Sequence, residues 1–83
     1  MALYMDVHTM GGPLGMTDVA QAHAADLATQ GAFDVRYLKY WVDEAQGKIF
    51  CLVEAPSADA AATVHRRAHG LVADEIYAVH EGS

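Results

Sequence analysis

The sequence contains two runs of helix-forming residues, and runs of strand-forming residues precede and follow each of them. Only a few folds have this order of elements. Alternation, or enrichment in aromatic and β-branched residues, predicts strands at residues 3–8, 35–42, 48–54 and 76–80. Helix-forming composition and helical spacing predict helices near residues 17–29 and 57–69. Two βα units joined by a hairpin make the split-βαβ motif. We therefore predict a ferredoxin-like βαββαβ sandwich of the α+β class, with a four-stranded antiparallel sheet and both helices on one face.

The length of 83 residues predicts a single domain, residues 1–83, that is marginally stable on its own. Small domains often gain support from disulfides, a metal or a second subunit. Cys51 is the only cysteine, so a disulfide within the chain is excluded, and a reducing compartment is expected. A metal ion and a second subunit remain as possible sources of extra stability.

The acidic composition restricts the partners. The net charge of −6, from 11 acidic and 5 basic residues, argues against nucleic acid and against an anionic membrane surface. No apolar run approaches the roughly 18 residues of a membrane span. The first residues lack the basic start and apolar stretch of a signal peptide. We expect a cytoplasmic protein with no nucleic-acid or membrane partner.

The two faces of the predicted sheet differ in character. Alternation directs one set of side chains toward the helices: Leu3, Met5, Val7, Ile49, Cys51 and Val53. The opposite, open face would then carry Tyr4, Asp6, His8, Phe50, Leu52 and Glu54, joined by Tyr37 and Trp41. An uncovered apolar patch of this kind usually marks an interaction surface. We expect a two-fold homodimer that packs sheet against sheet through Phe50, Leu52 and Trp41.

The histidines suggest a metal site. His65 and His69 are four positions apart on the second helix, so their Cβ atoms should lie about 5–6 Å apart on one face and could hold one ion. On spacing alone, a pair of solvated surface side chains is the stronger interpretation. Asp6 and His8 share a strand face and offer a carboxylate beside an imidazole. His23 lies on the apolar side of the first helix, where a packed core histidine is the alternative. We rank His65 and His69 first as ligands, Asp6 and His8 second, and His23 third.

Imidazole and carboxylate ligands favour nickel, zinc or copper over calcium or magnesium. A thiolate ligand has weak support, because Cys51 is predicted to face the core. An imidazole must lose its proton to bind a metal, so the affinity for such an ion should fall as the pH drops through about 6.5. Replacing both His65 and His69 with alanine should weaken metal binding at least tenfold, about 1.4 kcal/mol, and leave the fold intact.

Other kinds of site find less support. The sequence has no Walker loop, no Rossmann glycine pattern and no GxSxG motif. One alternative function stays open: a cofactor-free dimeric α/β-barrel-type enzyme, or a small-ligand-binding protein, that uses a His/Asp pair on the open sheet face.

Four stretches, residues 5–8, 22–27, 51–57 and 64–75, follow one another in an order and spacing that resemble a bacterial family of small nickel-binding, nickel-responsive proteins. The resemblance spans nearly the whole chain. It implies a ferredoxin-like dimer that binds nickel, with a role in sequestration or homeostasis rather than catalysis. The positions that match the family's motifs are Asp6, His8, His23, Asp26, Cys51, Glu54, His65, His69 and Glu75.

Overall fold

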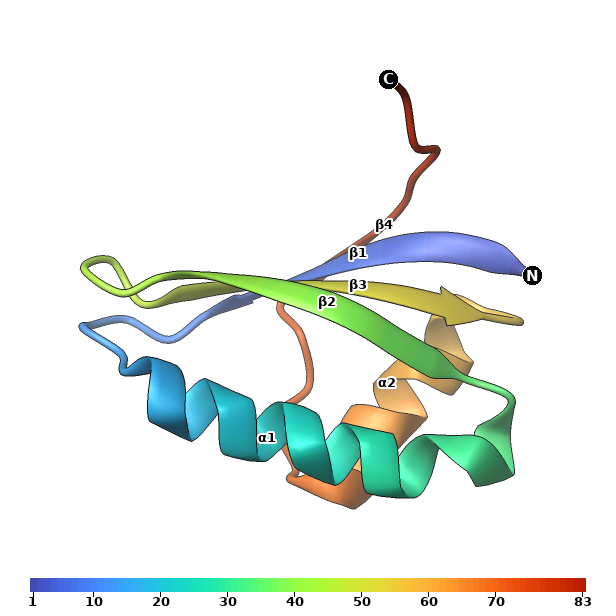
Figure 1. The fold of residues 1–83 in the computed structure, drawn as a ribbon, viewed down its shortest axis with the longest axis horizontal. Helices are drawn as coiled ribbons and strands as arrows, with labels where there is room; N and C mark the ends of the chain where they lie inside the picture. The colour runs from blue at the N-terminus through green and yellow to red at the C-terminus, as the bar shows by residue number, and fades with distance from the viewer.

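The fold follows the predicted order of elements. A computed structural model describes all residues, 1–83 (Figure 1). The elements are β1 (Ala2–Thr9), α1 (Met16–Thr29), the 3-10 turn η1 (Gln30–Phe33), β2 (Arg36–Asp43), β3 (Lys48–Ala55), α2 (Ala58–Ala68) and β4 (Glu75–Ala78). The strand order is β2-β3-β1-β4, with antiparallel neighbours throughout. The ferredoxin-like α+β fold is thus confirmed.

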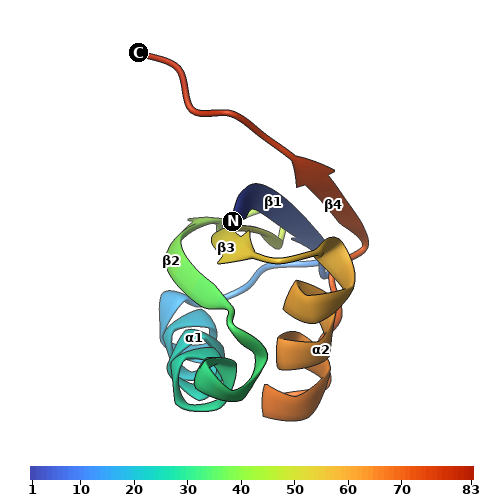
Figure 2. The ribbon, with the colours of Figure 1, turned by 90° about the vertical axis from the view of Figure 1, so that its right-hand side faces the viewer.

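The layers are plain in two views. Both helices lie side by side beneath one face of the sheet, and the other face is uncovered (Figures 1 and 2). The residues after β4 extend away from the sheet on the side opposite the helices. Helix α2 begins where the sequence predicts, because the Ser57 hydroxyl accepts a hydrogen bond from the Ala60 amide at 3.1 Å. No helix is both long enough and apolar enough to cross a membrane.

The predicted orientation of β1 is wrong. Asp6 pairs with Cys51 and His8 pairs with Ile49 in the β1–β3 register. Residues directly opposite each other point to the same face, so Asp6 and His8 turn toward the helices with the apolar residues of β3. Leu3, Met5 and Val7 consequently lie on the open side of the sheet, where Val7 is nevertheless buried, and Tyr4 packs against the core from the position opposite Val53. The inward polar pair is tolerated because His65 reaches it from α2, which alternation within β1 alone could not predict.

Tyr37 was also expected on the open face, and the structure places it in the core. A register irregularity lies between Tyr37 and Lys39 in the β2–β3 pairing. Such a bulge inserts a residue and changes which side chains face inward. Tyr37 and Tyr40 therefore both lie opposite helix-facing residues of β3, whereas Trp41 stays on the open face opposite Phe50. The core under the sheet is the cluster Val19, Val35, Tyr37, Ile49, Cys51, Val53, Ala55, Ala61 and Val64.

Candidate metal centre

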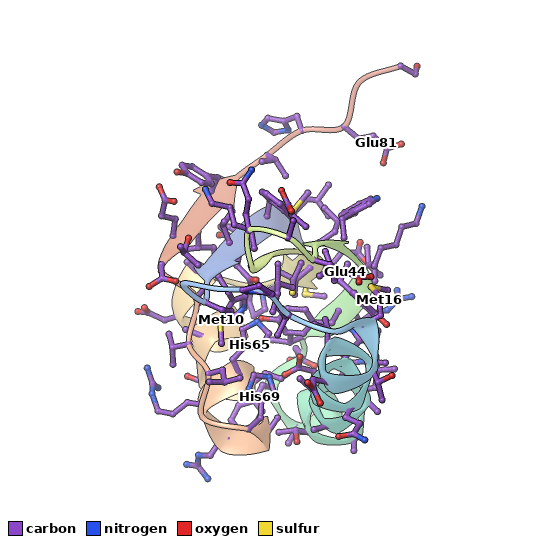
Figure 3. All side chains as sticks on the ribbon, turned by 90° about the vertical axis from the view of Figure 1, so that its left-hand side faces the viewer. Met10, Met16, Glu44, His65, His69 and Glu81 are labelled. Atoms are coloured by element: carbon purple, nitrogen blue, oxygen red, sulfur yellow. The ribbon has the colours of Figure 1, made fainter.

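His65 is the centre of a buried polar cluster between the sheet and the helices. It lies in the last turn of α2 and is 1% exposed. Its Nε2 atom lies 2.9 Å from Oδ2 of Asp6 on β1, and its Nδ1 atom lies 2.9 Å from Oδ1 of Asp26 on α1. Figure 3 shows His65 beneath the sheet and His69 farther from the sheet, between the two helices. Three elements that are far apart in sequence thus supply one site.

Further polar groups surround this centre. His8 Nε2 lies 3.3 Å from His65 Nε2 and 3.3 Å from Asp6 Oδ1. The Tyr37 hydroxyl donates to Asp6 Oδ2 at 2.9 Å. On the other side of His65, the Nε2 atom of His69 lies 3.0 Å from Asp26 Oδ1. The result is a continuous chain of polar side chains from the sheet to the gap between the helices.

The charges in the cluster depend on one another. Burial alone would lower the pKa of His65, but hydrogen bonds and charges from Asp26 and Asp6 raise it from 6.5 to about 9. Burial also acts to raise the pKa of Asp6, yet the hydrogen bond from His65 and the charges of His65 and His8 hold it well below its ordinary value. Without a metal at neutral pH, His65 is an imidazolium that donates one N–H to each carboxylate.

Two buried atoms of the cluster have no hydrogen-bond partner: Asp6 Oδ1 and His69 Nε2. Each lies close to another polar group, but without hydrogen-bond geometry. Buried polar atoms are nearly always satisfied, and an exception calls for an ion, a water or a functional role. A cation beside Asp6 Oδ1 would also have ring nitrogens of His8 and His65 nearby, which lie 3.3 Å apart. The donor set therefore fits a metal ion.

Two sets of side chains bring metal-binding atoms within 4.8 Å of one another, and His65 belongs to both. The first set is Asp6, His8, Cys51 and His65, all buried. The second set is Asp26, His65 and His69. A cavity of about 20 Å³ adjoins the cluster, with His8, His23, Asp26, Cys51, His65 and His69 among its lining residues. That volume holds one water molecule or one ion.

Comparison with protein families matches residues 4–79 to the family described as "Nickel responsive protein SCO4226-like". This chain belongs to that family. Among solved structures it is similar to the crystal structure of SCO4226 from Streptomyces coelicolor A3(2), with 43% sequence identity and a TM-score of 0.91. The alignment covers 99% of this chain and 100% of that one. Comparison with curated proteins gives no match.

The structure brings most of the predicted ligands of this SCO4226-like protein together. His65, His69, His8 and Asp6 all lie in the cluster, although Asp6 and His8 reach it from the inner face of β1. His23 lines the adjoining cavity, and its ring packs against Tyr40 with centroids 4.7 Å apart. It belongs to neither set of converging ligand atoms.

Sequence reasoning missed two members of the cluster as site residues, Asp26 and Tyr37. Asp26 shares a helix face with Val19 and His23, at spacings of seven and three, and that signal could have found it. Tyr37 was hidden by the bulge in β2. The two glutamates that matched the family's motifs lie elsewhere: Glu54 forms an ion pair with Arg36 at 3.5 Å, and Glu75 accepts a hydrogen bond from the Tyr77 hydroxyl.

Proposed function

We propose that this protein binds nickel at the buried cluster around His65 and serves to sequester the ion rather than to turn over a substrate. The observation that carries the proposal is the pair of buried atoms without partners, Asp6 Oδ1 and His69 Nε2, in a cluster of imidazoles and carboxylates. His8, Asp6 and His65 would hold the ion on the sheet side. His69 and Asp26 would hold an ion on the helix side, at the other nitrogen of His65, and His23 would join only through the cavity.

The type of ligand supports a transition metal. Imidazole nitrogens suit nickel, zinc and copper, whereas calcium and magnesium prefer sites built from oxygen alone. Each of the two converging sets contains two imidazoles. The nickel-responsive description of the family favours nickel among the three candidates. An acidic chain with one unpaired thiol also suits the cytoplasm, where we propose that the protein acts.

The enzymatic alternative loses its main argument. It required the Asp6–His8 pair on the open sheet face, and this pair faces the helices instead. At the cluster itself the cavity of about 20 Å³ has room for a water molecule or an ion, and an organic substrate needs several hundred Å³. The polar cluster therefore suits an ion better than a substrate.

Single alanine variants test the proposed site. His8→Ala and His69→Ala should each weaken nickel binding at least tenfold, about 1.4 kcal/mol, because the first removes the imidazole next to the unsatisfied Asp6 Oδ1 and the second removes an unsatisfied nitrogen itself. Calorimetric titration of protein purified without a histidine tag measures the affinity. His80→Ala is the matched control for metal binding, since His80 is an exposed histidine that lines the groove of the open sheet face rather than the cluster. His23→Ala should have the smaller effect of a residue at the cavity wall. Unchanged affinity in both cluster variants would contradict the site.

We further propose that two copies associate through the open sheet face. Trp41 on this face is 48% exposed, and a groove of about 400 Å³ is lined by Met5, Trp41, Leu52 and Val79 among others. Because the half-buried Leu3 and Met5 stand on this face in place of Asp6 and His8, it is more apolar than the sequence predicts. A large exposed apolar surface is typical of an interface. We propose that the occupant is a second copy of the chain, because two-fold symmetry brings the same face of both copies together.

Trp41→Asp should shift the protein from dimer to monomer, because the change would bury a charge in each half of the interface. Size-exclusion chromatography with light scattering, with nickel and without it, measures the mass. Leu27→Asp is the matched control, since Leu27 is 46% exposed on α1 in the opposite layer. A wild-type monomer at high micromolar concentration under both conditions would rule out the dimer.

A further inference from the structure

Cys51 lies where the core meets the polar cluster. It is 6% exposed on β3, and it pairs with Asp6 in the β1–β3 register. Because paired residues share a face, the side of the sheet that buries Cys51 is also the side that carries Asp6 and His8. The Cys51 thiol therefore faces both the core and the candidate metal ligands. Its sulfur lies within 4.8 Å of ligand atoms from Asp6, His8 and His65.

A second observation at the same place points to a ligand. Asp6 is 1% exposed, and its Oδ1 atom has no hydrogen-bond partner. This buried oxygen and the Cys51 sulfur belong to the same converging set. An ion between them would give the orphaned oxygen a partner and would have two imidazole nitrogens within reach.

Charge balance favours a thiolate there. A divalent ion buried in a region of low dielectric is stable when the surrounding ligands neutralise it. Neutral His8 and His65 supply no charge, and Asp6 supplies one negative charge. The thiolate of Cys51 would supply the second within the same set, while Asp26 would accept a hydrogen bond from the Nδ1 atom of the metal-bound His65.

We propose that Cys51 is a thiolate ligand of the bound metal, completing a site of two imidazoles, one carboxylate and one sulfur with Asp6, His8 and His65. This inference rests on the proposed function and deepens it. On binding, the metal–sulfur bond forms, the S–H bond breaks, and the proton leaves for solvent. The metal stays divalent, and no oxidant or reductant takes part.

The surroundings of Cys51 explain why its thiol would lose its proton only when a metal binds. Burial, with the nearby charge of Asp6, raises the pKa of Cys51 well above its ordinary value, so the residue stays protonated and unreactive without an ion. A coordinated thiol, by contrast, loses its proton to the metal. A thiolate also makes the site selective, because sulfur ligands favour nickel, zinc and copper over magnesium, calcium and manganese.

Bonding between nickel and the Cys51 sulfur can be detected by spectroscopy. Nickel added to tag-free wild-type protein should produce a sulfur-to-metal charge-transfer band in the near ultraviolet that saturates with binding. Cys51 is the single cysteine, so the band can come from no other residue of the chain. X-ray absorption of the zinc-loaded protein should show sulfur at about 2.3 Å beside nitrogen and oxygen at about 2.0–2.1 Å. Neither measurement depends on a variant that folds.

Variants then separate this inference from the proposed function. Cys51→Ala should abolish the band and weaken nickel binding at least tenfold, whereas His80→Ala should retain both. If nickel binds with His8-dependent affinity but no band and no sulfur distance are seen, Cys51 is not a ligand, and the proposed function stands without it. If wild-type protein binds no nickel, zinc or copper, the proposed function fails, and this inference fails with it.

Discussion

Replacing His65 with alanine should lower the free energy of unfolding of the metal-free protein by about 3–5 kcal/mol at neutral pH. The imidazolium of His65 lies between the carboxylates of Asp6 and Asp26, 2.9 Å from each. Its removal leaves two buried negative charges facing a hole, and breaking a buried ion pair from one side is strongly destabilising. A loss of this size is a large share of the roughly 5–15 kcal/mol that stabilises a small domain. Urea denaturation followed by circular dichroism measures it.

Two further variants show whether charge is the cause. Gln21→Ala, at an exposed position on α1, should change stability by no more than about 0.5 kcal/mol, as surface substitutions usually do. Adding Asp26→Asn to His65→Ala should restore part of the loss, because one uncompensated charge is then gone. If His65→Ala proves as mild as Gln21→Ala, the buried ionic cluster does not exist as described. The expectation from sequence, that His65 and His69 can be replaced without harm to the fold, is revised for this reason.

The order of the elements could be predicted from the sequence because each element carries its own signal. Ser57 caps α2 where predicted, and the hairpin between β2 and β3 follows from two strand-forming runs around a turn. The facing of β1 could not be predicted, because both of its faces contain apolar residues. Only the register with β3 and the arrival of His65 from α2 decide which face is inward.

The site was harder to predict than the fold for a related reason. Helical spacing identified His65 and His69 as neighbours, yet on spacing alone a solvated surface was the stronger interpretation. His65 is buried because it follows Val64 and lies one turn beyond Ala61 on the inner side of α2, and both of those residues are fully buried. A search for apolar periodicity counts a histidine as polar and so misses its burial. Partners on β1 and α1 become visible only in three dimensions.

Nickel affinity should rise steeply with pH up to about pH 9, rather than level off above the ordinary value for histidine. The pKa of His65 is raised from 6.5 to about 9 by Asp26 and Asp6, so at neutral pH an ion must displace a proton from its ring. Each pH unit below 9 then disfavours binding by about 1.4 kcal/mol, which is a tenfold change in affinity. Between pH 6 and pH 8 the proton on His65 alone accounts for a change of about a hundredfold, and a proton released from Cys51 on binding would make the change larger. Calorimetric titration in several buffers also reports the protons released.

The free energy of unfolding of the metal-free protein should fall as the pH rises, whereas nickel affinity increases. This opposite pH dependence gives an independent check. Because the folded pKa of His65 is raised, its stabilising contribution is fully present below about pH 6.5 and is lost as the pH rises through about 9. Because the pKa of Asp6 is lowered, its contribution is present above about pH 3.8 and is lost as the pH falls further. The metal-free protein should therefore be most stable between about pH 4 and 6.5, while nickel binds best on the alkaline side. Affinity that stays flat from pH 6 to pH 8, with unchanged metal-free stability from pH 6.5 to 9, would show that His65 is not held as an imidazolium between the two carboxylates.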